Sequence, residues 1–90
     1  MNYQFKTVSS FRRSLKKLNK EQKKAAKVAF GIFKQNPFDL RLRTHKIHKL
    51  SADYGVTVYS VYIQGDLRAV FYLEGNTVWS VDIGTHAIYR

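Results

Sequence analysis

The sequence predicts one α+β domain spanning residues 1–90, in which an antiparallel sheet is covered on one face by a helical hairpin. Three observations predict this fold. Apolar residues recur with helical spacing between residues 9 and 36, the spacing changes to strand-like alternation after residue 45, and glycine-containing turns separate the last three alternating segments. The expected order of elements is β-α-α-β-β-β-β.

The first two elements are a short strand and a helix. Aromatic and polar residues alternate over Tyr3–Val8, which predicts the strand. Ser9 or Ser10 is expected to cap the helix that follows, because a serine side chain accepts hydrogen bonds from the first helical amides. The apolar residues of this helix recur at intervals of four and three positions and are Phe11, Leu15 and Leu18.

A second helix begins after Asn19, which is a good N-cap, and Gln22 stands three residues later in the capping-box position. The helix should end at Asn36, because Pro37 disfavours helical geometry in the residue before it. Its expected buried stripe consists of Ala25, Val28, Ala29, Ile32 and Phe33.

Four further strands follow a connecting loop at Phe38–Arg43. Alternation predicts them at Lys46–Leu50 (weakly), Thr57–Ile63, Leu67–Leu73 and Thr77–Ile83. Turns at residues 64–66 and 74–76 join the last three strands into a meander.

Side-chain parity then predicts the register of this meander. A three-residue loop over residues 64–66 would place Ile63 opposite Leu67 and Tyr62 opposite Arg68. The face covered by the helices would then carry Tyr59, Val61, Ile63, Leu67, Ala69, Phe71 and Leu73.

The second turn has two possible forms. A two-residue turn at Gly75-Asn76 would bury Ser80 and Asp82, whereas a three-residue loop buries the alternate positions instead. We expect the longer loop, because burying an unpaired carboxylate costs several kcal/mol. The residues pointing inward would then be Trp79, Val81 and Ile83, and the outer face would display Tyr62, Arg68, Asp82 and His86.

The charge of the chain predicts a polyanionic partner. Sixteen Lys and Arg residues against six Asp and Glu give a net charge of +10. RNA, DNA, an anionic membrane surface and an acidic protein all fit this charge. Eight cations gather on the predicted hairpin, opposed there only by Glu21, and this surface is expected to dock ribosomal RNA or an acidic protein. They are Arg12, Arg13, Lys16, Lys17, Lys20, Lys23, Lys24 and Lys27.

Several classes of protein are disfavoured by what the sequence lacks. Without cysteine, neither disulfides nor thiolate metal sites can form, and this composition suits a reducing cytoplasm. No apolar run reaches the length of a membrane span, and residues 1–10 lack the apolar stretch of a secretion signal. No metal site is expected either, because the histidines have no carboxylates at ligand spacing.

Three features are candidates for chemistry. The histidines His45, His48 and His86 come first, although a single histidine is usually a half-buried polar residue. The second is Arg68, within a strand, for which an ion pair with Asp82 is the structural explanation. The third is the C-terminal segment from residue 82, where histidine, tyrosine and arginine follow a glycine.

Short motifs in a fixed order extend over the whole chain. They are the helix with Phe11, Leu15 and Leu18, the Asn36-Pro37 break, the segment His48-Lys49-Leu50, the run Gly65-Asp66-Leu67-Arg68-Ala69-Val70-Phe71-Tyr72, and the ending Ile83-Gly84-Thr85-His86 with Tyr89. In these motifs the chain resembles the RelE/ParE toxin superfamily, and most closely its YafQ-like branch. The element order of that superfamily is the one predicted above.

The resemblance implies a toxin of a type II toxin–antitoxin pair that cuts messenger RNA in the ribosomal A site. In that reaction the 2′-hydroxyl attacks its own 3′-phosphate and leaves a 2′,3′-cyclic phosphate, without a metal ion or other cofactor. The implied partners are a cognate acidic antitoxin, the ribosome and mRNA, in the cytoplasm. Lys46 and Lys49 join the hairpin cations as residues expected to bind RNA, the ribosome or the antitoxin.

The resemblance also implies roles for individual residues. His48, Asp66 and His86 match catalytic positions of the branch, with His86 as general acid and His48 or Asp66 as base. Arg68 matches a phosphate-stabilising arginine of other branches. The candidate catalytic set is completed by Tyr62 and Tyr89.

The chain departs from the branch at two positions. Tyr62 stands where the branch commonly has a second strand histidine, and Leu67 where it has an aromatic residue. Ser60 and Tyr62 also replace the strand lysines of the RelE branch, although Tyr62 retains the ability to hydrogen-bond a phosphate or stack on a base. One alternative is a ParE-type inhibitor of DNA gyrase, because relatives of that type share the fold. The departures leave a second, a degenerate homologue that only binds nucleic acid or antitoxin.

Overall fold

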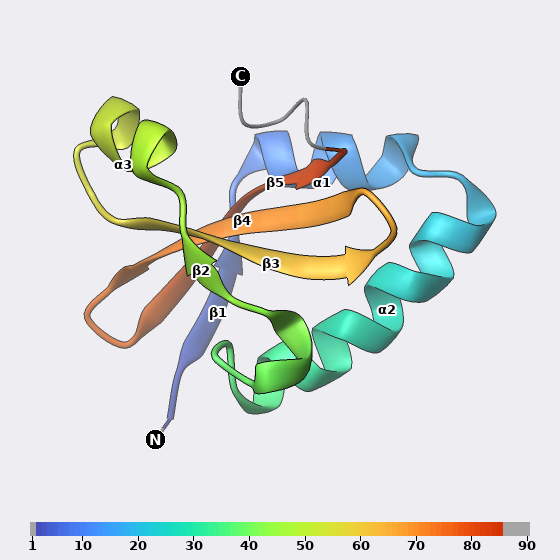
Figure 1. Cartoon of the computed structure of the whole chain (residues 1–90), viewed down its shortest axis with the longest axis horizontal. Coiled ribbons are helices and arrows are strands. Elements are labelled where there is room, and N and C mark those ends of the chain that lie inside the picture. The colour runs from blue at the N-terminus through green and yellow to red at the C-terminus, as the bar shows by residue number, and fades with distance from the viewer. Residues whose placement is uncertain (1, 86–90) are drawn as a thin grey trace.

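The computed structural model describes residues 2–85, and these form a five-stranded sheet in the order β1-β5-β4-β3-β2 (Figure 1). The strands are β1 (Gln4–Thr7), β2 (His45–Lys46), β3 (Val58–Gln64), β4 (Leu67–Glu74) and β5 (Thr77–Gly84). The helices are α1 (Ser9–Lys17), α2 (Lys20–Gln35), the 3-10 helix η1 (Leu40–Leu42) and α3 (His48–Tyr54). The predicted α+β class and the helical hairpin are confirmed.

The sheet is mixed, which corrects the expectation of a wholly antiparallel one. β1 runs parallel to β5, with Gln4 opposite Thr77 and Thr7 opposite Ser80. Short turns impose antiparallel pairing on strands that follow one another, but they do not set the direction of two strands from opposite ends of the chain. The sequence pattern therefore predicted the strand β1 without predicting its neighbour.

α1 begins differently from the prediction. Its N-cap is Val8, which makes no side-chain capping hydrogen bond. Ser10 instead donates a hydrogen bond from Oγ to the carbonyl of Val81, at 2.8 Å. The serine thus fastens α1 to β5 beyond the point where β1 ends, and the predicted serine cap is wrong.

α2 has the predicted ends, and Ala29, Ile32 and Phe33 of its predicted stripe pack in the core, but Val28 does not. Asn19 and Gln22 form the full capping box, and the helix ends at Gln35. Val28, expected to be buried, is 69% exposed, whereas Ala26 is 1% exposed. Phe33 is buried and Phe30 packs beside it, so the large aromatic rings decide which face of the helix is turned inward.

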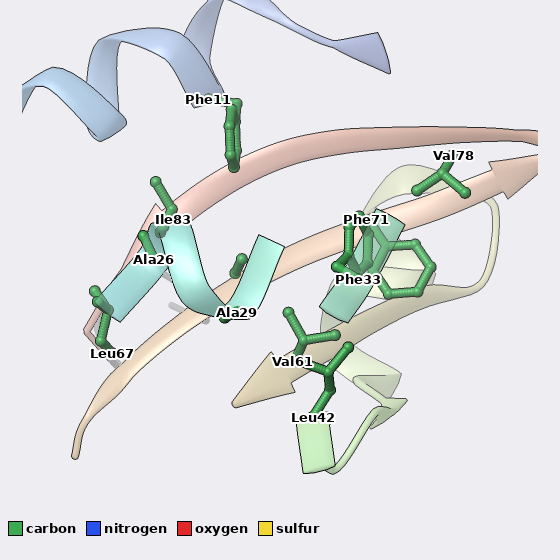
Figure 2. Packing of buried hydrophobic residues seen from close by; sticks show 11 residues of the cluster. Phe11, Ala26, Ala29, Phe33, Leu42, Val61, Leu67, Phe71, Val78 and Ile83 are labelled. Carbon is green, nitrogen blue, oxygen red and sulfur yellow. The ribbon is translucent and has the colours of Figure 1, made fainter. Parts of the chain in front are cut away.

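The main core lies between the sheet and the hairpin helices α1 and α2 (Figure 2). Phe71 on β4 is 1% exposed. Its ring centroid lies 5.0 Å from that of Phe33 on α2 and 5.2 Å from that of Tyr59 on β3. Phe11 of α1 is also buried in this cluster.

The sequence did not predict α3, which replaces most of the expected strand at Lys46–Leu50. Strand pairing is limited to His45 and Lys46, after which His48 begins the helix. Leu50 packs against Val58 and further valines in a smaller cluster. Because α3 has seven residues and buries only Leu50, its periodicity is too short to show in the sequence.

The β3–β4 hairpin has the predicted cross-strand pair but a shorter turn. Tyr62 lies opposite Arg68, as expected. Gln64 pairs with Leu67, so the turn consists of Gly65 and Asp66, and the register shifts between Tyr62 and Gln64. The expected pairing of Ile63 with Leu67 is therefore wrong, although both residues still pack in the main core.

The β4–β5 turn is also the shorter form, because Glu74 pairs with Thr77. Trp79 consequently faces away from the main core and stacks on Tyr72, with the ring centroids 6.4 Å apart. Val81 packs with the smaller cluster, so the inward placement predicted for Trp79 and Val81 is wrong.

The longer loop was expected because a short turn would bury Asp82, and a bulge in β5 avoids that burial. Phe71 pairs with Ser80 and Val70 with Asp82, so Val81 is the extra residue between the two pairs. The bulge restores parity, and Ile83 is buried in the main core as predicted. Asp82 is thereby kept from the core beneath α2.

Candidate functional site

Two residues of the predicted site, Tyr62 and Arg68, are in contact on one face of the sheet. The Arg68 guanidinium carbon lies 4.7 Å from the centroid of the Tyr62 ring. Arg68 Nη1 donates to the carbonyl of Gly65 at 2.8 Å, and the Gly65 amide donates to the Tyr62 hydroxyl at 3.1 Å. The two side chains therefore fix the turn that carries Asp66.

Arg43 is a third member of this cluster that sequence reasoning missed. Its guanidinium carbon lies 4.9 Å from the Tyr62 ring centroid. Arg43 precedes β2, whereas Arg68 lies on β4, so the two cations reach Tyr62 from the two neighbours of β3. The only signal in the sequence was a basic residue two positions before His45, and its place beside Tyr62 could be inferred only once the start of β2 was known.

His45 lies on the same face, one row along the sheet. It pairs with Ser60, which is two residues from Tyr62 on β3 and therefore shares its face. His45 Nδ1 lies 2.9 Å from the carbonyl oxygen of Arg43. Because a carbonyl can only accept, Nδ1 carries the proton in this contact and Nε2 is the nitrogen left to take one up.

The other predicted histidines stand elsewhere. His48 is exposed in the first turn of α3, and no contact joins it to Tyr62 or Arg68 within the described chain. Lys46 and Lys49 are also exposed. His86 and Tyr89 lie outside the described residues.

The ion pair with Asp82, which was the structural alternative for Arg68, is not formed. Asp82 Oδ1 accepts hydrogen bonds from Ser14 Oγ at 2.6 Å and from the Ile83 amide at 2.9 Å. Arg68 lies opposite Gly84 in β5, one row away from Asp82. The carboxylate thus fastens α1 to β5, and Arg68 keeps its position beside Tyr62.

An ion pair in the loop after α2 has a marked electrostatic effect. Arg41 Nε lies 3.0 Å from Asp39 Oδ1. The hydrogen bonds from the Arg41 side chain and backbone lower the pKa of Asp39 to about 2. Asp39 therefore stays charged and caps the start of η1, and Arg43 follows the end of η1.

The second notable surface is a groove of about 830 Å³ bordered by β1, α1 and α2. Its apolar lining consists of Phe5, Phe11, Leu15, Ala26, Phe30 and Phe33. Five lysines also line it, namely Lys6, Lys16, Lys23, Lys27 and Lys34. Of these, sequence reasoning missed Lys6 and Lys34, which lie outside the dense basic stretch of the hairpin.

All eight predicted hairpin cations, Arg12 to Lys27, are exposed, which fits a binding surface but does not choose a partner. Among residues 2–85, no three His, Asp or Glu side chains gather in a way that would hold a metal ion. In the same range, no helix has the length and apolar character needed to cross a membrane.

No protein-family model and no curated protein matches the sequence. Solved structures do match over nearly the whole chain. YafQ from E. coli strain BL21(DE3) superposes with a TM-score of 0.75 at 13% identity, covering 97% of each chain.

Two toxin–antitoxin complexes are also similar. In the archaeal RelE–RelB complex from Pyrococcus horikoshii OT3, the match has a TM-score of 0.71 at 15% identity and covers 94% of this chain and 96% of that one. In RelBE2 from Mycobacterium tuberculosis, it has a TM-score of 0.69 at 19% identity and covers 96% and 100%. The chain therefore has the fold of the RelE and YafQ toxins.

Proposed function

We propose that the protein is the toxin of a type II toxin–antitoxin pair and cleaves mRNA on the ribosome. The observation that carries the proposal is the placement of His45, Tyr62 and Arg68 on one sheet face, on three adjacent strands. A proton-accepting side chain beside fixed cations is what cleavage of a phosphodiester by its own 2′-hydroxyl requires. The shared fold of RelE and YafQ supports the same function.

The reaction forms a bond between the 2′-oxygen and phosphorus and breaks the bond from phosphorus to the 5′-oxygen. In our proposal His45 Nε2 takes the proton of the 2′-hydroxyl, since its Nδ1 is held by the Arg43 carbonyl. Arg68 stabilises the charge on the phosphorane. His86 gives the proton to the departing 5′-oxygen, a role that rests on the resemblance of its motif.

His45 competes with His48 and Asp66 for the role of base. His45 lies on the face of Tyr62 and Arg68, whereas His48 lies on α3 and Asp66 in the exposed β3–β4 turn. Comparing His45→Gln with His48→Gln separates the two histidines, because both are exposed and neither substitution disturbs the core.

The function is tested by induced expression in bacteria, with growth, translation and mRNA ends followed together. Wild type should arrest growth and cut mRNA within the reading frame. His45→Gln, His86→Gln and Arg68→Ala should lose about 10²–10⁴-fold in cleavage rate, as removal of acid–base or oxyanion-stabilising groups does. His48→Gln should cut normally. Arrest of growth with intact mRNA, as expected of a gyrase inhibitor, or no arrest at all, would contradict the proposal.

The groove favours a protein as the partner on the helical side. The phenylalanine rings of the floor carry no hydrogen-bonding group, and Phe11 and Phe33 are buried, whereas an amphipathic protein segment can bury its apolar side over such a floor. Lysines around the floor complement acidic residues on that segment. We therefore assign the groove to the acidic antitoxin.

Gly31 provides a matched pair of variants for this assignment. It lines the groove, and a Cβ at this position would meet no atom within 4 Å, so side chains fit without disturbing the fold. Gly31→Glu adds a negative charge and bulk to the groove, and Gly31→Ala does neither. Gly31→Glu should weaken antitoxin binding at least tenfold in calorimetry while Gly31→Ala stays near wild type. Equal affinities would remove the groove from the interface.

A further inference from the structure

We propose that Arg43 and Arg68 bind consecutive phosphates of single-stranded RNA, with Tyr62 as the residue that positions both guanidinium groups. This inference rests on the proposed function, because it names how that site holds its substrate. It adds Arg43, which no sequence motif indicated, and it gives Tyr62 a role other than base stacking.

The contacts around Tyr62 support a positioning role. Arg43 and Arg68 lie over its ring, with guanidinium carbons 4.9 Å and 4.7 Å from the centroid. A ring quadrupole attracts a cation over its face, and here it holds two like charges near each other. Because the two cations already occupy the ring, a base could stack on Tyr62 only by displacing one of them.

The register places Tyr62 and Arg68 in one row across the sheet. Tyr62 pairs with Arg68, and His45 pairs with Ser60. Arg43 precedes β2, and its guanidinium group reaches the Tyr62 ring from that side of β3. Cations therefore approach Tyr62 from both neighbours of β3, which suits the repeating charges of a nucleic-acid strand.

The backbone of Arg43 is fixed although its side chain is exposed. Its φ of 49° and ψ of 40° put it in the left-handed region, and it is the one non-glycine residue with positive φ between residues 2 and 85. Its amide donates to the Leu40 carbonyl at 3.2 Å, and its carbonyl accepts from His45 Nδ1. The left-handed conformation costs about 1–2 kcal/mol in a non-glycine residue, so the surrounding hydrogen bonds hold Arg43 there.

Neither cation is neutralised within the described chain. Arg41 is paired with Asp39, but Arg43 and Arg68 have no carboxylate partner among residues 2–85. Arg68 contacts carbonyl oxygens through Nη1 alone, so its other donors make no hydrogen bond to residues 2–85 and can serve a ligand.

Phosphate is favoured over a protein carboxylate as the ligand. A guanidinium group matches the geometry of either anion. The row has no apolar floor, however, because the Tyr62 ring is covered by the cations, whereas the groove on the helical side has an extensive one. A protein segment needs apolar burial for affinity, but an RNA backbone binds through its charges alone.

The test uses RNA that cannot be cleaved, so that it measures binding apart from catalysis. A fluorescent 2′-O-methyl hexanucleotide is titrated with antitoxin-free protein at several salt concentrations. Each lost phosphate contact should lower the slope of log K against log salt by about 0.7. Arg43→Asn removes the charge while asparagine still adopts the left-handed region. Arg41→Gln, in the same loop, is the matched control.

The inference predicts that Arg43→Asn and Arg68→Gln each lower the slope by about 0.7, whereas Arg41→Gln leaves it unchanged. Tyr62→Phe keeps the ring and should keep the slope, and Tyr62→Leu should lower it. In NMR spectra of the arginine Nε–Hε groups, the signals of Arg43 and Arg68 should shift together on adding the hexanucleotide, while that of Arg41 stays in place.

An Arg43→Asn variant with the wild-type slope, or unshifted Arg43 signals in wild type, would overturn the inference, whatever cleavage shows. Should Tyr62→Leu fail to fold, Tyr62→Phe and the NMR signals still decide. If the Arg43 effect is found but wild type neither cuts mRNA nor arrests growth, the proposed function fails and the RNA-binding row stands.

Discussion

Phe33 and Val28 lie five residues apart on α2, and exchanging each for alanine tests which face of the helix is buried. Phe33 is 5% exposed and Val28 is 69% exposed. Phe33 makes edge contacts with Phe5 and Phe71, with centroids 5.5 Å and 5.0 Å away. Truncating a buried phenylalanine costs about 3–5 kcal/mol. We expect the lower end for Phe33→Ala, because Phe33 borders the groove and its neighbours can relax into that space.

Val28→Ala should instead be neutral or slightly stabilising. An exposed valine contributes little packing, and alanine is the better helix former by up to about 0.6 kcal/mol. Urea unfolding gives both values directly. A loss of about 3 kcal/mol in Phe33→Ala also lowers Tm by roughly 12 °C or more in a domain of this size. If Val28→Ala costs more than about 1 kcal/mol, or if Phe33→Ala costs less than about 1 kcal/mol, the buried face of α2 has been assigned wrongly.

Three smaller predictions test individual contacts. Ser14→Ala removes the hydrogen bond to Asp82, and a loss of about 1–2 kcal/mol in urea unfolding is expected; no loss would mean that the bond does not fasten α1. Arg41 lowers the pKa of Asp39 to about 2. The stability that this ion pair gives to the folded state is therefore full above about pH 4 and is lost as pH falls through 2. The Tm difference between wild type and Asp39→Asn should shrink over that range, and a constant difference would contradict the pairing. The buried indole N–H of Trp79 has no hydrogen-bond partner among residues 2–85, so Trp79→Phe should change stability by less than about 1 kcal/mol.

The sequence predicted the elements that are long or flanked by strong local signals. The capping box at Asn19 and the proline after Asn36 set the ends of α2. The pairing of Tyr62 with Arg68 was predicted from alternation and a three-residue loop, and it is found with the shorter turn because the register shifts between Tyr62 and Gln64. These features depend on residues that are close in sequence. Local rules therefore sufficed for them.

What the sequence missed depends on long-range packing. The parallel pairing of β1 with β5 joins opposite ends of the chain, and the bulge at Val81 keeps Asp82 out of the core while the turn stays short. Neither feature leaves a periodic signal in the sequence, because each depends on how distant elements pair and pack.

The candidate site was predicted only in part, because some of its residues are brought together by long-range strand pairing. Tyr62 and Arg68 belong to a hairpin, and their contact followed from parity. Arg43 and His45 join them only because β2 pairs with β3 for two residues before α3 begins. His48 was preferred to His45 because the His48-Lys49-Leu50 segment resembles a catalytic motif of the YafQ-like branch, and that assignment stays a prediction.

Cleavage of mRNA on the ribosome is tested by analysing the ends of the RNA that the purified protein produces from mRNA on a programmed ribosome. Our account predicts cleavage in the A-site codon, a 2′,3′-cyclic phosphate on one fragment and a 5′-hydroxyl on the other. It also predicts a rate about 10²–10⁴-fold lower for His45→Gln but unchanged for His48→Gln. Intact mRNA, fragments ending in a 3′-hydroxyl and a 5′-phosphate, or equal rates for wild type and His45→Gln would contradict it.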